Sequence, residues 1–281
     1  MIALVLALVL TAAPQEVPAV CDPAPGEAPD WAACVEALPE GSPEQRWARL
    51  NQAAEAYLNR DYGAAERLYD AAADGDETLF SDVVLHTYRA ETYRRVGRDK
   101  DATADARIAW RILSGDPAYE AARTRSPPLT EDVQRGVLQV VLPILKTGRD
   151  PDFGAAFDAY RALPVKGAEG HAALAVMLER LGDAEGALAA SQTALKADPT
   201  NAGYLNNHCY ILVRGGRPAE GLPYCEKAVQ SAPESAPTRH SLAAALAGAG
   251  RCEEAEAALA EARRLEPATA LYQEPIACTA G

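Results

Sequence analysis

The sequence is poor in aromatic residues and in positive charge. Aromatic residues make up 6% of the 281 residues, with three Phe and three Trp. Strands are rich in aromatic and β-branched side chains, so this scarcity weighs against a β-sandwich or barrel. Lys and Arg number 27 against 40 Asp and Glu, which gives a net charge of −13. A nucleic-acid binder needs a basic footprint, and an anionic lipid surface would repel this chain. The charge instead favours a protein or peptide partner that is neutral to basic.

The sequence also lacks an apolar run long enough to cross a membrane. Its longest run, Ile2–Leu10, is too short for a transmembrane span. Small residues follow the run as far as Ala13, which is typical of a secretory signal peptide, although no Lys or Arg precedes it. We therefore expect residues 1–13 to be a signal peptide and the mature chain to be exported to the periplasm or the extracellular space. The alternative is a cytoplasmic chain in which these residues begin a buried helix.

Motifs for catalysis, metal binding and cofactor binding are absent as well. No GxSxG, phosphate-binding loop or HExxH sequence occurs, and the cysteines have neither CxxC nor zinc-ligand spacing. Asp74–Glu77 resembles a fragment of a calcium loop but lacks the later ligands, so we interpret it as a solvated loop. The four histidines, none in a paired-ligand spacing, are His86, His171, His208 and His240. We predict no catalytic residue, no metal and no cofactor.

What the sequence does have is an internal period of 34 residues. The recurring residues are Gly182, Gly216 and Gly250; Ala187, Gly221 and Ala255; Ala194, Ala228 and Ala262; and Pro199, Pro233 and Pro267. The first glycine of each period can end a helix in a left-handed turn. The small residues then allow a second helix to pack closely against the first, and the proline ends that second helix. Each period therefore predicts a hairpin of two helices.

This pattern resembles the tetratricopeptide repeat family, and the chain is identified as a bacterial, exported member of it. The resemblance is strong over 168–267, which hold three repeats, and weaker over 44–117 and 132–166, which hold two divergent repeats and one degenerate repeat. In the first divergent copy Arg60 stands where the turn glycine belongs. The resemblance implies an all-α fold, a right-handed superhelical α-solenoid of helix-turn-helix repeats.

Segments outside the repeats complete the predicted organisation. A Pro-rich, cysteine-bearing leader covers 14–43, a linker at 118–131 interrupts the array, and 268–281 form a C-terminal cap that covers the last hairpin. The linker would separate a block of two copies from a block of four.

The six cysteines have an even count, which suits disulfide bonds in an exported protein, although six buried thiols are the alternative. Fifteen pairings are possible. The candidates are Cys21, Cys34, Cys209, Cys225, Cys252 and Cys278. Cys21 and Cys34 would close a short loop in the leader, and a bond from Cys252 to Cys278 would hold the cap. For Cys209 and Cys225 the separation of paired helix axes, about 8–10 Å, leaves a bond unassured.

The resemblance implies that the first helices of the repeats line an inner face that binds a protein or peptide. Asn, Tyr and Arg side chains suit that role because they hydrogen-bond a backbone or dominate interfaces. The candidates are Asn51, Tyr57, Tyr88, Arg94, Arg95, Asn206, Asn207, Tyr210, Arg214 and His240. Asn207 matches one position of the family's carboxylate clamp, but its partner positions hold no Lys or Arg, so that clamp is not expected. Two alternatives remain: a structural component that assembles through an apolar outer patch, and an enzyme with a deep pocket around 118–165.

Overall fold

The computed structural model describes residues 18–21, 28–73, 82–126 and 128–278. Over these residues the regular structure is helical throughout, which confirms the all-α prediction. The predicted signal peptide at 1–13 and the segment Asp74–Glu77 lie outside the described residues.

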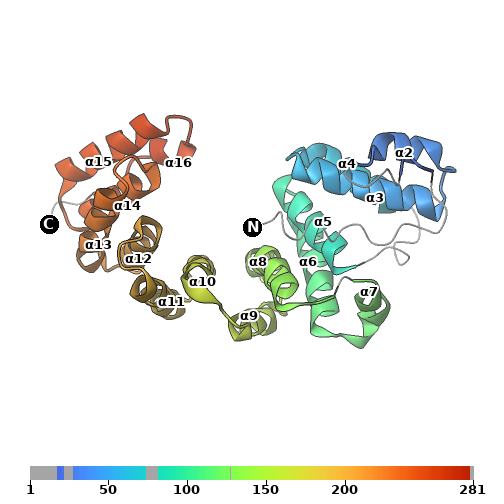
Figure 1. Cartoon of the computed structure of the whole chain (residues 1–281), viewed down its shortest axis with the longest axis horizontal. Coiled ribbons are helices and arrows are strands. Elements are labelled where there is room, and N and C mark those ends of the chain that lie inside the picture. Colours follow the sequence, from blue (N-terminus) through green and yellow to red (C-terminus); the bar gives the residue numbers. More distant parts are fainter. Residues whose placement is uncertain (1–17, 22–27, 74–81, 127, 279–281) are drawn as a thin grey trace. The chain divides into compact units, whose positions relative to one another are not determined.

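Most of the helices pack in consecutive antiparallel pairs, as Figure 1 shows. The pairs are α3 (Pro43–Leu58) with α4 (Tyr62–Ala73), α5 (Val83–Arg95) with α6 (Asp99–Ser114), α8 (Glu131–Thr147) with α9 (Phe153–Ala162), α10 (Gly167–Leu181) with α11 (Ala184–Ala197), α12 (Ala202–Arg214) with α13 (Pro218–Ser231), and α14 (Ala236–Gly248) with α15 (Cys252–Leu265). Four short helices lie outside the pairs: α2 (Trp31–Ala37), η2 (Pro117–Tyr119), α7 (Glu120–Arg125) and α16 (Ala270–Gln273). The period of 34 therefore corresponds to one helix pair.

The turn inside a pair has left-handed backbone. Gly182, Gly216 and Gly250 have φ of 86°, 75° and 77°, a conformation that glycine adopts at no steric cost. Arg60 and Arg149 take the same place in two other pairs, with φ of 63° and 52°. These two turns hold a backbone that is unfavourable for a residue with a Cβ.

The seam between paired helices is built from small residues, as the sequence predicts. Ala187, Ala194, Ala228 and Ala262 are completely buried. At Gly221 an added Cβ would lie 3.1 Å from the carbonyl oxygen of Cys209 on the facing helix. The second helix of each pair can approach the first only because these positions carry little or no side chain.

The chain divides into two compact units, residues 1–163 and 164–281. The division does not fall at 118–131, where the sequence analysis expects a linker and the structure has η2 and α7. The reason is that α8 packs against both α5 and α6. An ion pair of Arg107 with Asp150 and another of Arg111 with Asp152 also join α6 to the turn before α9. The degenerate repeat therefore belongs to the first unit.

Three disulfides join Cys21 to Cys34, Cys209 to Cys225, and Cys252 to Cys278, with Cα–Cα distances of 5.0, 5.4 and 5.6 Å. The first lies in the leader, where α2 packs on α3 through an edge-to-face contact of Trp31 with Trp47, ring centroids 5.1 Å apart. The second joins the two helices of one pair, because the small residues at their seam bring the backbones within disulfide range. The third holds the segment after α16 against the last pair.

Candidate functional site

In the second unit the first helices of the pairs lie against one another. Helix α12 contacts both α10 and α14, whereas no comparable contact joins α11 to α13 within the described residues. Each second helix packs instead on the first helices that flank it. We call the side on which α10, α12 and α14 meet the first-helix face, and the opposite side, where α11 and α13 stand apart, the outer face.

The period of 34 places equivalent residues beside one another on the first-helix face. Val176 and Tyr210 are one period apart, and so are Asn206 and His240. Along α12, Asn206, Tyr210 and Arg214 are four residues apart and share one side of the helix. The structure thus brings together five of the predicted residues, Asn206, Asn207, Tyr210, Arg214 and His240, on neighbouring helices of one unit.

The side chains on α12 are available to different degrees. Asn206, Asn207 and Tyr210 are half-buried, and Arg214 is exposed. The Asn206 Oδ1 atom is buried and has no hydrogen-bond donor. Arg214 Nε donates to Glu179 Oε1 at 3.2 Å, but with 64% of its side chain exposed this ion pair contributes little. A partner could therefore recruit Arg214 at small cost.

His240 lies at the end of this face that is nearest the C-terminus. Its ring is tilted against that of buried Tyr272 in α16, with centroids 5.2 Å apart. Burial lowers the pKa of His240 below its ordinary value, so the imidazole is neutral at pH 7.

The sequence analysis missed two residues of the first-helix face on α10. Val176 is an exposed large hydrophobic residue, with 48% of its surface accessible, and Glu179 is the partner of Arg214. The signal that could have found Val176 is the period itself, because Val176 precedes Tyr210 by 34 residues.

In the first unit, three of the residues predicted to bind a partner are buried. Asn51 is 6% exposed, and its Nδ2 donates to the Trp47 carbonyl at 2.9 Å. Tyr57 is 7% exposed and Tyr88 is 3% exposed, with their ring centroids 5.0 Å apart. Asn51 and the two tyrosines are therefore core residues, and a partner could not contact them without local unfolding.

Arg94 and Arg95 both bind Glu91, a residue that the sequence analysis did not single out. Arg94 Nε donates to Glu91 Oε2 and Arg95 Nε to Glu91 Oε1, each at 2.7 Å. Burial raises the pKa of Glu91, but the hydrogen bonds and charges of the two arginines outweigh it and hold the pKa below its ordinary value. The two guanidinium groups thus share one anion on their own helix.

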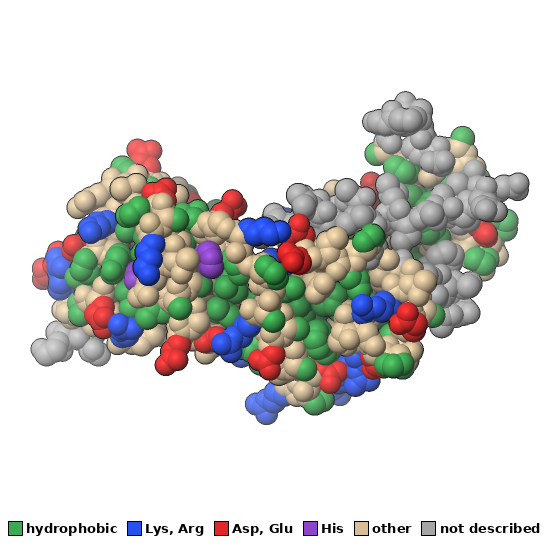
Figure 2. All heavy atoms as spheres, turned by 60° about the horizontal axis from the view of Figure 1, so that its bottom comes forward, with side chains coloured by type: hydrophobic (Ala, Val, Ile, Leu, Met, Phe, Trp, Pro, Cys, Tyr) green, Lys and Arg blue, Asp and Glu red, His purple; other side chains and the backbone are tan. Residues whose placement is uncertain are grey.

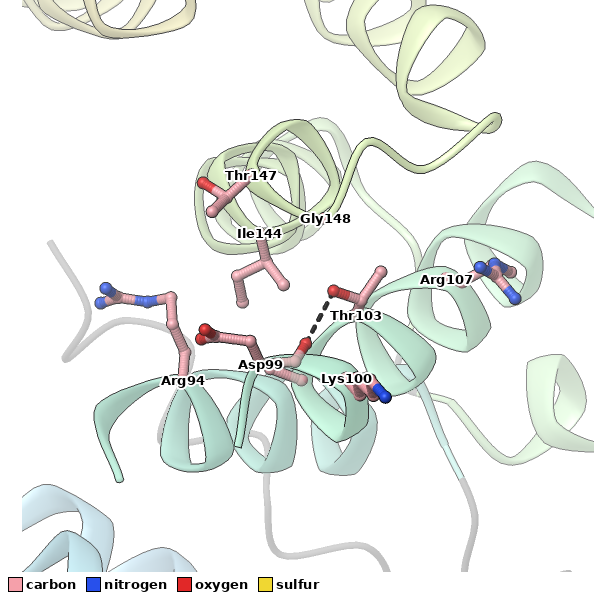
Figure 3. A pocket seen from close by; sticks show the side chains of 9 residues that line it. Arg94, Asp99, Lys100, Thr103, Arg107, Ile144, Thr147 and Gly148 are labelled. Carbon is pink, nitrogen blue, oxygen red and sulfur yellow. Dashed lines mark hydrogen bonds between the residues drawn. The ribbon is translucent and has the colours of Figure 1, made fainter. Parts of the chain in front are cut away.

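Next to Arg94 is a pocket of about 330 Å³ between α5, α6 and α8 (Figure 3). Ile144 points into it from α8, and Thr103 donates to the Asp99 carbonyl at 2.8 Å. Arg107, also on its wall, is paired with Asp150. The residues that line the pocket include no nucleophile beside a base, so it gives no support to an enzyme site near 118–165.

A buried ionic cluster joins α5 to α6. Asp105 accepts hydrogen bonds from His86 Nδ1 at 2.8 Å and from Arg89 Nε at 2.7 Å. Burial raises the pKa of Asp105, but these hydrogen bonds outweigh it and the pKa lies below its ordinary value. All three residues are at most 8% exposed, so the cluster is structural and closed to a substrate.

Searches for other kinds of site were made over the same described part of the chain. No group of three or more His, Cys, Asp or Glu residues there could hold a metal ion. None of its helices has the length and hydropathy needed to traverse a bilayer. Figure 2 shows acidic and basic side chains interspersed on the face that it presents.

Comparison with known proteins agrees with the repeated helix pairs described above. A family model described as tetratricopeptide repeat matches residues 212–274, from the end of α12 through α16. Residues 212–274 are therefore similar to tetratricopeptide repeats. No curated protein sequence matches the chain at significant similarity.

Solved structures resemble the chain at low sequence identity. A tetratricopeptide repeat protein from Parabacteroides merdae ATCC 43184 is 13% identical, with a TM-score of 0.59 over 86% of this chain and 87% of that one. The APC/C hetero-tetramer Cut9-Hcn1 gives 12% identity and a TM-score of 0.51 over 86% of this chain and 44% of that one. MamA from Desulfovibrio magneticus RS-1 gives 21% identity and a TM-score of 0.39 over 50% of this chain and 78% of that one. The first two share this fold.

Proposed function

We propose that the chain is a non-catalytic scaffold that binds an extended segment of a partner protein on the first-helix face of its second unit. The observation that carries this proposal is the stripe of Asn206, Tyr210 and Arg214 along α12, flanked by exposed Val176 on α10. Amide groups can pair with both the N–H and the C=O of a partner backbone, and Tyr and Arg are the residue types that dominate interfaces.

The unmade hydrogen bond of Asn206 Oδ1 supports the same proposal. A buried acceptor without a donor costs about 1–3 kcal/mol. Rotation of this amide to meet a backbone N–H of the partner would remove that cost on binding. The net charge of −13 favours a neutral or basic segment.

The test is selection of ligands from a random peptide library displayed on phage, using the whole chain with its disulfides intact. Peptides that are enriched should bind the triple variant Asn206→Ala, Asn207→Ala and Arg214→Ala at least about ten-fold more weakly, because each removes a contact of about 0.5–1.5 kcal/mol. The matched control is Gln230→Ala with Glu256→Ala, two exposed residues on the second helices α13 and α15. Equal binding to all three proteins would overturn the proposal.

Each of the two alternative functions, self-assembly and catalysis, requires a specific structural feature. Self-assembly through the outer helices calls for an apolar patch there, yet Val176 on α10 and Leu271 on α16 are the exposed large hydrophobic residues of the described part. An enzyme around 118–165 calls for convergent polar groups in a deep pocket, and the pocket beside α8 is lined mostly from α5 and α6. Neither observation favours a second function.

We also propose that the mature chain works in the periplasm or outside the cell, after removal of residues 1–13. The three disulfides support an oxidising, exported location, because such bonds persist there and are reduced in the cytosol. Mass spectrometry of the native protein should find a first residue near Pro14 and a mass lower than that of the reduced chain by six hydrogen atoms. Free thiols with residues 1–13 still present would contradict it.

A further inference from the structure

The outer face of the second unit has a pocket that the proposed function does not use. It has a volume of about 430 Å³ and lies where α11 and α13 stand apart, with α12 as its floor. Leu188 comes from α11, His208 and Leu212 from α12, and Tyr224 and Lys227 from α13. All of these residues belong to the second unit.

The tautomer of His208 follows from its neighbour Ser191. The Ser191 Oγ atom lies 2.8 Å from the Leu188 carbonyl and 2.8 Å from His208 Nδ1. A carbonyl can only accept, so the single hydroxyl hydrogen of Ser191 goes to Leu188. Ser191 must then accept a hydrogen bond from His208, which places a proton on Nδ1.

The other ring nitrogen of His208 is left as an acceptor. Burial, and to a lesser extent the charge of Arg217, lower the pKa of His208, so the ring carries one proton at pH 7 and that proton is on Nδ1. Nε2 therefore has a free lone pair. His208 is 3% exposed and is one of the residues that line the pocket, so the pocket is where a ligand can meet its ring.

The lining has an apolar part and a polar part. Leu188, Leu212 and Pro223 form the apolar part together with the Tyr224 ring, which stands edge-on to the His208 ring with centroids 4.6 Å apart. The polar part is Gln192, Lys227, Arg217 and Glu220, of which Arg217 is bound to Glu220 by two hydrogen bonds of 2.8 and 2.6 Å. An occupant with an apolar ring for the first part and a hydrogen-bond donor for His208 matches this lining.

We propose that this outer pocket is a second binding site, which takes a tyrosine side chain of a partner protein. The phenol O–H would donate to His208 Nε2 while the ring packs among Leu188, Leu212 and Tyr224. Serine and threonine carry a donor but are too short to fill the walls, and phenylalanine fills them but leaves the acceptor unpaired. Tyrosine combines a large apolar ring with a terminal donor.

The experiment uses the full oxidised chain and two probes, N-acetyltyrosine amide and N-acetylphenylalanine amide, which differ by one hydroxyl. Nitrogen-15 NMR of the histidine rings first tests the tautomer: Nδ1 of His208 should be protonated and Nε2 not. On titration the tyrosine probe should shift the Nε2 resonance and bind about ten-fold more tightly than the phenylalanine probe, the effect of one net hydrogen bond.

Two variants separate this site from the first-helix face. His208→Phe keeps a ring but has no acceptor, and it should bind both probes alike. The Asn206→Ala, Asn207→Ala and Arg214→Ala triple variant should bind the tyrosine probe as the natural chain does, so loss of peptide binding there leaves this proposal standing. A proton on Nε2, equal affinity of the two probes for the natural chain, or a preference for the tyrosine probe that persists in His208→Phe would overturn it.

Discussion

Single residues with left-handed backbone set the turn of each hairpin. Glycine supplies it in four of the turns, at Gly97, Gly182, Gly216 and Gly250. Arginine supplies it in two others, at Arg60 and Arg149, where a Cβ crowds the following carbonyl. The hairpin can thus be made without glycine, at a local cost that the packing of the two helices offsets.

Gly97→Ala is expected to lower the free energy of unfolding by about 1–2 kcal/mol, because φ is 83° there. An added Cβ at Gly97 would meet nothing within 4 Å, so the loss would come from the backbone alone. Urea unfolding measures it. Gly154→Ala is the matched control: it lies inside α9, has open space around it, and should gain about 0.5–1 kcal/mol. Equal effects at the two positions would refute this explanation of the turn.

Two histidines should make stability depend on pH. Burial is the main cause that lowers the pKa of His208 and of His240 from an ordinary value of 6.5. As pH falls through 6.5 the unfolded chain takes up protons that the folded chain does not yet bind, so stability present above that pH is lost. Urea midpoints should therefore fall from about pH 8 to about pH 5. The decrease should shrink in the His208→Gln, His240→Gln double variant; a midpoint that rises with acid would contradict these directions.

At the scale of helix pairs, the seam decides how closely two helices approach. Ala194, Ala228 and Ala262 occupy the same place in three pairs, and all are fully buried. The interior there has no space for extra methylene groups. The repeated spacing of these alanines therefore reflects how close the two helices of each pair lie.

Ala228→Leu should cost about 1–3 kcal/mol of stability, because three further carbons must enter the seam between α12 and α13. Thermal unfolding of the oxidised protein measures the loss. Ala219→Leu, at an exposed position on the same helix, should change stability by less than about 0.5 kcal/mol. A tolerated leucine at Ala228 would mean that the pair is more loosely packed than described.

The sequence predicted the hairpins because the period of 34 marks every turn and seam of the last three repeats. The sequence did not predict which side chains are buried by segments that lack this period. Asn51 lies on α3, which contacts α2, α4 and α5, and nothing in the repeat pattern places α2 there. Tyr57 is covered by Tyr62 and Tyr88, which come together only when α4 and α5 fold beside α3.

The same limit applies to the outer pocket. Sequence spacing puts His208 on a first helix, but its protonation depends on Ser191, 17 residues earlier on another helix. The hydroxyl bond of Ser191 to Leu188 decides the tautomer, and a periodic pattern of residue types does not contain that information.

At the scale of the whole molecule, the chain divides into two compact units, residues 1–163 and 164–281. The second unit contains three complete pairs, the cap and two of the three disulfides. Repeat arrays gain stability from contacts between neighbouring repeats, and three pairs with a cap supply them.

A fragment of residues 164–281 should therefore fold alone. We expect a helical circular dichroism spectrum, a cooperative thermal transition, and a mass lower than that of the reduced fragment by four hydrogen atoms. A fragment without a cooperative transition would show that the second unit depends on the first.

Each disulfide joins a cysteine to the next one along the chain, across 13, 16 and 26 residues. In the export that we propose, both members of a pair would leave a translocation channel before the next pair follows. Oxidation in order of emergence thus produces the native connectivity directly, so the polypeptide can acquire its cross-links without the shuffling that interleaved pairings require.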